Sequence, residues 1–474
     1  MNQEKMNQLI QLLDGAVALD GQEISIKDEE KLQGKIEELV KKAVLDQDEE
    51  TRLQARYLVR VIAAEAGVHP SSIHDLYLAR GRGDVPNTFT VPAINLRSLT
   101  FYAARIIFKI AREINAGAFI FEIARSETGY TEQRPSEYAA NILGAAVAAG
   151  YQGPVFIQGD HYQISASRYR DDPDSEIQAL KDLTREAVSA GFFNIDVDAS
   201  TLVDLSVEDV VKQQTLNSEL TAYFTKFIRD LEPDGITVSI GGEIGEVGEE
   251  NSTEEELRAY LDSLEVDLEK TAPGAEGLSK ISVLTGTSHG GVVLPDGSIK
   301  DVAVDFELLK HLGKVARESY GLGGAVQHGA STLPESAFGK FPEYDTLEIH
   351  LATNFQNILY AEIPEKLREE IYAYLDQNHA SERKEGQTDE QFYYKTRKRA
   401  LGPFKSSIWS IDQDHLANVI AAWDTQFRNL FSSLGVADTR PYVDDHIRLV
   451  KAPARLADYL SGEAEQEDTS DLAD

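Results

Sequence analysis

The chain has 474 residues, 42% of them apolar, so it is long enough to bury a large hydrophobic core with extensions around it. Its formal net charge of -34 argues against nucleic-acid and membrane partners, because such a surface repels phosphate backbones and anionic headgroups. Cysteine is absent, which excludes disulfides, thiolate metal ligands and cysteine nucleophiles. Any chemistry must therefore use His, Asp, Glu, Ser or Lys.

Neither a membrane span nor a signal peptide is evident. No apolar run approaches the roughly 18 to 20 residues that cross a bilayer. The first residues, MNQEKMNQLIQLL, lack the order of charged, apolar and small residues that marks a cleaved signal. We therefore expect a cytoplasmic protein.

Residues 1–82 carry apolar residues at helical spacing. Leu9, Leu12 and Leu13 recur in one segment, and Leu32 and Ile36 begin a second stripe. The region offers neither strand-like alternation nor a chemical motif. We predict a helical N-terminal extension.

Between residues 83 and 378, short apolar runs alternate with helical patterns. That order is typical of repeated strand-helix units and a parallel sheet. Eight such strands close most naturally into a (β/α)8 TIM barrel, which we predict for this domain. The predicted strands are 89–95, 118–124, 155–161, 193–198, 236–243, 281–289, 325–328 and 347–353.

Polar residues stand at the carboxyl ends of nearly all these strands, the end at which barrel enzymes carry their active sites. Glycines accompany them in the segments GDH, GGEIG, SHGG and QHGAS. Packing alone does not explain so many metal-ligand residue types at one edge. These residues are Asn95, Asp160, His161, Asp198, Glu243, His289, His328 and Thr353.

Three histidines from three strands suit a tetrahedral divalent metal. They are His161, His289 and His328. Neutral imidazoles bind zinc and leave a position open for a substrate oxygen. Any one of them alone could equally be a barrel-end histidine bonded to backbone. Together they predict a metal centre.

The segments FTVPAIN, IQGDHYQ, GGEIGEVGEE, GTSHGG and QHGASTLP, in this order, resemble the class II (zinc-dependent) fructose-bisphosphate and ketose-bisphosphate aldolases. The resemblance covers about residues 89–357. It implies cleavage of a ketose bisphosphate, most simply fructose 1,6-bisphosphate, to dihydroxyacetone phosphate and glyceraldehyde 3-phosphate. It also implies catalytic Zn²⁺, a second divalent or monovalent cation, and a homodimer or larger homo-oligomer.

The resemblance assigns roles to individual residues of this chain. His161, His289 and His328 would hold zinc, with Glu243 as an alternate or second-metal ligand and Asp198 near the second cation. Asp160 would be the acid/base at the C4 oxygen. Glu249 or Glu250 would remove the proton from the ketone carbon, and the choice stays open. The substrate and its phosphate would contact Asn95, Gly290, Gly329, Ser331 and Thr353.

The physical chemistry agrees with these roles. A metal next to the ketone offsets the negative charge of the enediolate that cleavage generates. An aspartate beside a ligand can move a proton, although Asp160 could instead only orient His161. Backbone amides of glycine-rich turns can bind phosphate in an acidic protein, although the same glycines could simply make tight turns.

Three positions depart from the family pattern. His350 stands where an asparagine is usual near the end of the eighth strand, and Gln158 stands where a histidine is common. Ala124 and Arg125 replace the polar pair that is usual after the second strand. Arg125 could clamp a substrate anion or form a surface ion pair. The departures leave the identity of the sugar open, including a tagatose bisphosphate or another ketose phosphate.

Two alternatives remain. A Schiff-base aldolase needs a lysine at a strand end, but Lys280 precedes its strand and is expected at the opposite end of the barrel. A noncatalytic accessory subunit of an aldolase is the other alternative, since FIFEIARSETGY and RPSEYAANI have some likeness to one. The complete set of three histidines and Asp160 argues against it.

After the barrel, residues 355–375 read as one closing helix and 379–460 as a C-terminal helical extension. The extension carries Lys395, Arg397, Lys398 and Arg399 close together. Such a run is usually a solvated helix face, but Arg397 could reach the second phosphate. Residues 461–474 are acidic and poor in apolar residues, which predicts a disordered tail.

Overall fold

Eight parallel strands close into a barrel in the computed structural model, which describes residues 3–20, 23–245, 250–286, 304–460, 469 and 472. The strands follow one another around the barrel in chain order, and the last pairs with the first. Each overlaps a predicted strand, so the barrel prediction is confirmed. They are β4 (Val91–Asn95), β5 (Ile120–Ala124), β6 (Gly153–Gln163), β7 (Asn194–Asp198), β8 (Ser239–Glu243), β9 (Lys280–Val283), β10 (Ala325–Gln327) and β11 (Glu348–Leu351).

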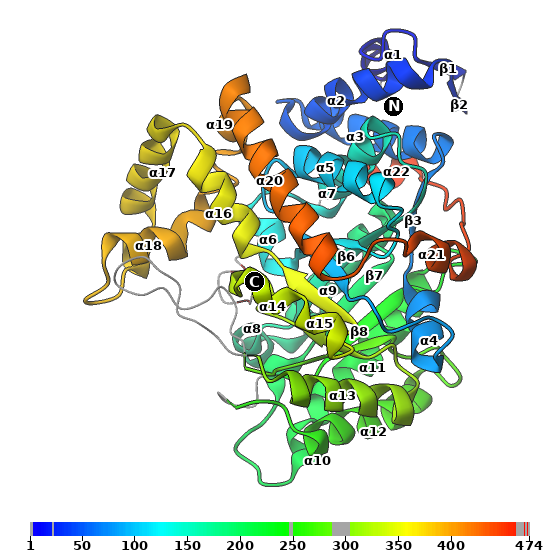
Figure 1. Cartoon of the computed structure of the whole chain (residues 1–474), viewed down its shortest axis with the longest axis vertical. Helices are drawn as coiled ribbons and strands as arrows, with labels where there is room; N and C mark the ends of the chain where they lie inside the picture. The colour runs from blue at the N-terminus through cyan, green and yellow to red at the C-terminus, as the bar shows by residue number, and fades with distance from the viewer. Residues whose placement is uncertain are drawn as a thin grey trace.

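Amphipathic helices surround the barrel (Figure 1). In the helix between β6 and β7, Leu180, Leu183 and Ala187 are buried, and Gly191 ends the helix with φ of 103°. None of the helices in the described ranges is both long and apolar enough to cross a bilayer. The surrounding helices are α5 (Thr100–Glu113), α6 (Arg125–Tyr130), α7 (Pro135–Ala148), α8 (Ala166–Asp171), α9 (Pro173–Ala190), α10 (Val210–Gln213), α11 (Thr215–Leu231), α12 (Glu254–Thr271), α13 (Phe306–Tyr320), α14 (Glu335–Phe338) and α15 (Lys340–Glu343).

The N-terminal extension is largely helical, with α2 and α3 packed against α7 of the barrel. A buried ion pair of 2.8 Å between Arg56 and Glu137 joins α3 to α7. The expectation that this region lacks strands is wrong. A short hairpin precedes α2, and β3 adds parallel to the first residues of β6. The elements are α1 (Gln3–Gln11), β1 (Val17–Asp20), β2 (Glu23–Ile26), α2 (Glu29–Leu45), α3 (Glu49–Glu65), β3 (Val68–Ser71) and α4 (His74–Arg82).

The segment after the barrel is helical too, and α22 lies beside α3 of the N-terminal extension (Figure 1). The predicted closing helix over 355–375 is two helices, because Pro364 cannot continue the first. Of the acidic tail only residues 469 and 472 are described, and the Thr469 hydroxyl donates to the Ser126 carbonyl. The helices are α16 (Thr353–Glu362), α17 (Glu365–Asn378), α18 (Asp389–Thr396), α19 (Lys405–Trp409), α20 (Gln413–Ser433), α21 (Arg440–His446) and α22 (Leu456–Leu460), with 3-10 turns η1 (Ser200–Leu202), η2 (Ala330–Thr332), η3 (Ala380–Glu382) and η4 (Arg397–Ala400).

Candidate functional site

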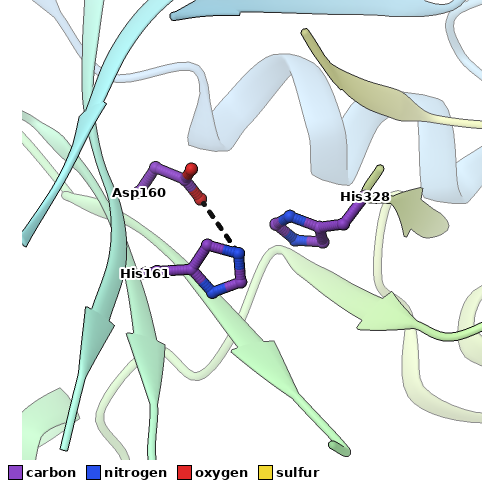
Figure 2. Close-up of side chains that lie close together, drawn as sticks. All are labelled: Asp160, His161 and His328. Carbon is purple, nitrogen blue, oxygen red and sulfur yellow. Dashed lines mark ion pairs between the residues drawn. The ribbon is translucent and has the colours of Figure 1, made fainter. Parts of the chain in front are cut away.

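An irregularity in β6 places two consecutive polar side chains at the open end of the barrel. Consecutive residues of a regular strand point to opposite faces, but the pairing of β6 with β7 shifts register between Gly159 and Tyr162. Within the shift, His161 has φ of 40°, a left-handed conformation that is rare for a residue with a side chain. Asp160 and His161 therefore lie together rather than on opposite faces (Figure 2).

Gly159 makes this irregularity possible. A Cβ atom at this position would lie 2.4 Å from the ring of Tyr162, which is buried across the shifted register. The left-handed backbone of His161 is strained, and such strain is common at functional sites. The GDH segment is therefore a structural unit, in which the glycine lets the next two side chains converge.

His161 and His328 face each other across the barrel mouth, with ring centroids 4.3 Å apart (Figure 2). His328 follows β10, and its Nε2 lies 3.0 Å from the Ser282 hydroxyl on β9. Asp160, His161 and His328 are buried, and each offers a ligand atom within 4.8 Å of the others. One nitrogen-and-oxygen donor set thus forms from β6 and β10.

Two carboxylates orient the ring of His161. Its Nδ1 lies 3.0 Å from Asp198 on β7 and 3.2 Å from Glu243 on β8. Asp198 is itself held in place by Gln163 at 2.6 Å and by the Ser200 hydroxyl at 2.6 Å. Carboxylates behind a histidine set its ring orientation and raise its basicity as a metal ligand. Nδ1 is thereby engaged, and Nε2 faces Asp160 at 3.9 Å.

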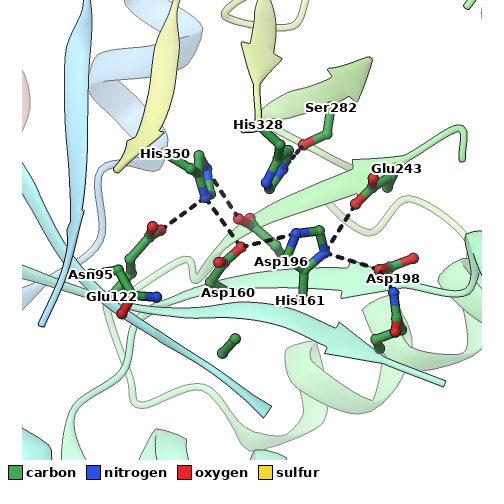
Figure 3. A network of polar contacts seen from close by, with 12 residues as sticks. Asn95, Glu122, Asp160, His161, Asp196, Asp198, Glu243, Ser282, His328 and His350 are labelled. Carbon is green, nitrogen blue, oxygen red and sulfur yellow. Dashed lines mark hydrogen bonds and ion pairs between the residues drawn. The ribbon is translucent and has the colours of Figure 1, made fainter. Parts of the chain in front are cut away.

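His350 is the third imidazole at the barrel mouth, 4.1 Å from the ring of His328 (Figure 3). Its Nδ1 lies 3.0 Å from Glu122 and 3.2 Å from Asp160. Its Nε2 lies 2.7 Å from Glu348, two residues earlier on β11. His350, which the sequence analysis left out of the metal centre, therefore lies inside the site.

Lys280 lies below His350 in the barrel interior. Its ammonium contacts Asp196 at 2.9 Å and Glu348 at 2.5 Å, and it donates to Gln158 at 2.8 Å. Burial alone would lower the pKa of Lys280, but the two carboxylates outweigh it and raise the pKa well above its usual value. The two carboxylates therefore stabilise the ammonium form of this lysine, whereas a Schiff-base nucleophile has to be a neutral amine.

The carboxylates of the site are electrostatically crowded. Burial, together with Asp160, raises the pKa of Glu122 to about 8, and burial, together with Asp198, raises the pKa of Glu243 to about 7. Burial would lower the pKa of His161 and of His350, but the facing carboxylates raise both. The pocket therefore strongly favours positive charge, as a cation site does.

The loops after β10 and β11 meet beside these histidines. Gly329 adopts φ of 70°, which starts the turn of η2. The Ser331 hydroxyl accepts a hydrogen bond of 2.6 Å from the Ala352 amide, and Thr353 begins α16. Barrel enzymes often bind phosphate at the loops after these last two strands, where helix N-termini present amides.

The family is decided by a sequence comparison. Residues 85–407 match the model of the class-II fructose-bisphosphate aldolases, which is more than half of the chain. The chain belongs to this family. The resemblance drawn from the sequence motifs is thereby confirmed. Among curated proteins, no sequence matches the chain.

Solved structures are similar at low identity. A fructuronate-tagaturonate epimerase of Cohnella laeviribosi is 10% identical, with a TM-score of 0.54, over 84% of this chain and 90% of that one. A fructose-bisphosphate aldolase of Campylobacter jejuni is 16% identical, with a TM-score of 0.47, over 78% of this chain and 97% of that one. At such identity the epimerase likeness concerns the fold alone.

The donor set of this aldolase-family chain fits a divalent cation. Imidazole nitrogens and carboxylate oxygens are the protein ligands that zinc accepts when cysteine is absent. Asp160, His161 and His328 offer one ligand atom each within 4.8 Å of the others, so one ion could contact all three. His289, the third predicted ligand, lies outside the described residues, as do Gly290 and Glu249.

Other predicted site residues lie at varying positions. Glu250 is exposed before α12. Asn95 is buried at the end of β4 and donates to Glu127. Arg397 is the first residue of η4, and its guanidinium lies over the rings of Tyr360 and Tyr394. It also donates to Asn357 of α16, the helix that begins at Thr353.

Arg125 forms a buried ion pair with Glu176 at 2.6 Å. Of the two interpretations given for Arg125, an ion pair is therefore what forms, although inside the protein rather than on its surface. Lys280 is the first residue of β9 rather than the residue before the strand, and its buried side chain contacts Asp196 and Glu348.

The sequence interpretation missed Glu122, Asp196 and Glu348 as parts of the site. Their signal is a charged residue at an inward position of a barrel strand, in IFEIA, NIDVD and EIHL. Asp196 and Asp198, like Glu348 and His350, are two residues apart and hence share one face of their strand. Charged pairs at that spacing in an otherwise apolar strand indicate a polar barrel interior.

Proposed function

We propose that this protein is a metal-dependent aldolase that reversibly cleaves a ketose bisphosphate, with fructose 1,6-bisphosphate as the first substrate to test and zinc as the first metal. The observation that carries the proposal is the strained turn at Asp160 and His161. It sets a carboxylate beside an imidazole that faces His328, within a family of aldolases.

His161 and His328, with His289, would hold the catalytic ion, and Glu243 or Asp198 would hold or flank a second cation. When bound, the ion would supply positive charge that offsets the negative charge developing on the ketone half during cleavage. Asp160 would accept the proton of the C4 hydroxyl. As the new carbonyl forms, the C3–C4 bond breaks and its electron pair moves toward C2. The aldehyde half then leaves.

Proton transfer at C3 completes the reaction. Glu249 or Glu250 would deliver the proton to C3 and remove it in the reverse direction. Gly329, Ser331 and Thr353, with Gly290, would bind the phosphate of the ketone half through amides and hydroxyls. Asn95 would contact the substrate, and Arg397 would meet the second phosphate.

The deciding experiment is cleavage of fructose 1,6-bisphosphate by purified protein before and after treatment with a chelator. We expect one catalytic divalent metal per chain, loss of activity on its removal, and recovery with zinc. Activity that survives chelation and is trapped by borohydride would contradict the proposal, because it would indicate a lysine Schiff base.

A substrate panel then sharpens the assignment. Tagatose 1,6-bisphosphate and other ketose phosphates test which sugar is cleaved. Analysis of the products for the C4 epimer of the substrate tests whether the two halves rejoin before they leave the enzyme. No turnover of any ketose by metal-loaded protein would favour a noncatalytic accessory role. We also propose a homodimer or larger homo-oligomer, which light scattering of purified protein would measure.

A further inference from the structure

A second group of ligands lies beside the first, around His350. Its Nδ1 is 3.0 Å from Glu122 and 3.2 Å from Asp160, and ligand atoms of all three lie within 4.8 Å of one another. These separations approach the roughly 3.3 Å expected between ligands of one small divalent ion. The three side chains come from β5, β6 and β11 and are all buried.

Buried charge in this part of the barrel is strongly unbalanced. Six carboxylates line it: Glu122, Asp160, Asp196, Asp198, Glu243 and Glu348. Lys280 pairs with Asp196 and Glu348, whereas the other four face imidazoles. Buried carboxylates are costly unless they are paired, so this part of the barrel favours cations in addition to the one ammonium.

One polar atom beside this second group has no printed partner. Oδ1 of Asn95 is buried and forms no hydrogen bond with any described residue. Asn95 stands directly opposite Glu122 in the pairing of β4 with β5, and both appear at the same side of His350 (Figure 3). Buried polar atoms are nearly always satisfied, so this amide oxygen suits a bound cation.

We propose that Glu122, Asp160 and His350 bind a second divalent cation, with Asp160 shared between this ion and the ion at His161 and His328. Two carboxylates and one imidazole form a mixed oxygen and nitrogen set, which Mn²⁺ and Zn²⁺ both accept. Ions that share a carboxylate lie about 3.5–4 Å apart in two-metal sites. The Asn95 amide oxygen is available as a further ligand.

This site is distinct from the cation position at Asp198 and Glu243, which lies on the Nδ1 side of His161. The two positions are separated by the Asp160–His161 turn. The second ion would hold Asp160 in place, with His350 as its nitrogen ligand.

Metal content of the full chain tests the proposal. Apoprotein is titrated with Zn²⁺ and, separately, with Mn²⁺, and bound metal is counted after gel filtration. We expect at least two ions per wild-type chain and one fewer in both His350→Asn and Glu122→Gln. His74→Asn is the control, because His74 is another buried histidine, located in α4. Equal metal content in wild type and both variants would overturn the proposal.

A spectroscopic measurement on the wild type avoids any dependence on the folding of variants. With both sites filled by Mn²⁺, the shared carboxylate should couple the ions and replace the six-line signal of isolated Mn²⁺ in electron paramagnetic resonance. An uncoupled signal at saturation would contradict the shared site, as would coupling that persists in a folded His350→Asn variant. Neither readout depends on aldolase activity, so a one-metal aldolase would leave the proposed function standing while overturning this inference.

Discussion

The His161 side and the His350 side of the site stabilise their buried carboxylates in different ways. On the His161 side, Asp198 is satisfied by neutral donors from Gln163 and Ser200. On the His350 side, Glu348 is tied to the Lys280 ammonium and to the Tyr77 hydroxyl. Neutral donors position a carboxylate without cancelling its charge, whereas an ammonium largely neutralises it. The His161 side is therefore built to orient a ligand, and the His350 side depends on a buried charge network.

The largest effect is expected from removing the imidazole of His328, which faces both His161 and His350. His328→Ala should remove the catalytic metal and abolish cleavage while the fold persists, because His328 follows β10 at the barrel mouth, where its ring faces those of His161 and His350. Metal analysis, activity and circular dichroism measure this. Full retention of metal content in a folded variant would remove His328 from the ligand set.

Asp160 belongs to both sides, and its removal separates chemistry from binding. At saturating zinc, Asp160→Ala should keep the ion that the histidines hold, lose the second ion and bind ketose phosphate, yet lose cleavage by about 10² to 10⁴-fold. Proton exchange on dihydroxyacetone phosphate should suffer less, because that step is assigned to Glu249 or Glu250. Near-normal cleavage at saturating zinc would mean that Asp160 only orients His161.

The charge network on the His350 side should be the more fragile part of the fold. Lys280→Met leaves Asp196 and Glu348 buried without their ammonium and should destabilise the protein by about 3–5 kcal/mol. Lys270→Met is the matched control, since this exposed lysine makes one surface pair with Asp267 and should cost at most about 1 kcal/mol. Urea unfolding compares the two, and equal losses would contradict a structural role for the network.

The smallest expected effect tests orientation on the His161 side. Asp198→Asn keeps the shape of the side chain but weakens the acceptor for His161, and should lower zinc affinity about 10- to 100-fold. Asp204→Asn is the control, because Asp204 accepts from Ser206 in the same kind of turn on the exposed surface. Competition with a chromogenic chelator gives both affinities. Unchanged affinity in Asp198→Asn would show that Asp198 does not support the ligand.

Much of the barrel could be predicted from local patterns. Short apolar runs separated by helical stripes predicted all eight strands, because a parallel sheet buried on both faces needs such runs. The strand β3 was missed, since VHPS is short and contains Pro70. Its pairing partner lies some 85 residues away in β6, at Gly153 to Phe156, so no local signal could have indicated it.

The sequence by itself determined that the strand ends carry Asp160, His161, Asp198, Glu243 and His328, because each strand can be located from its own run of apolar residues. Only the tertiary structure decided which of them converge. The turn at His161 depends on a register shift between β6 and β7, and the place of His350 depends on closure of β11 against β4. Register and closure arise from pairing between distant segments of the chain. The contacts among Glu122, Asp160 and His350 therefore could not be predicted from any one segment.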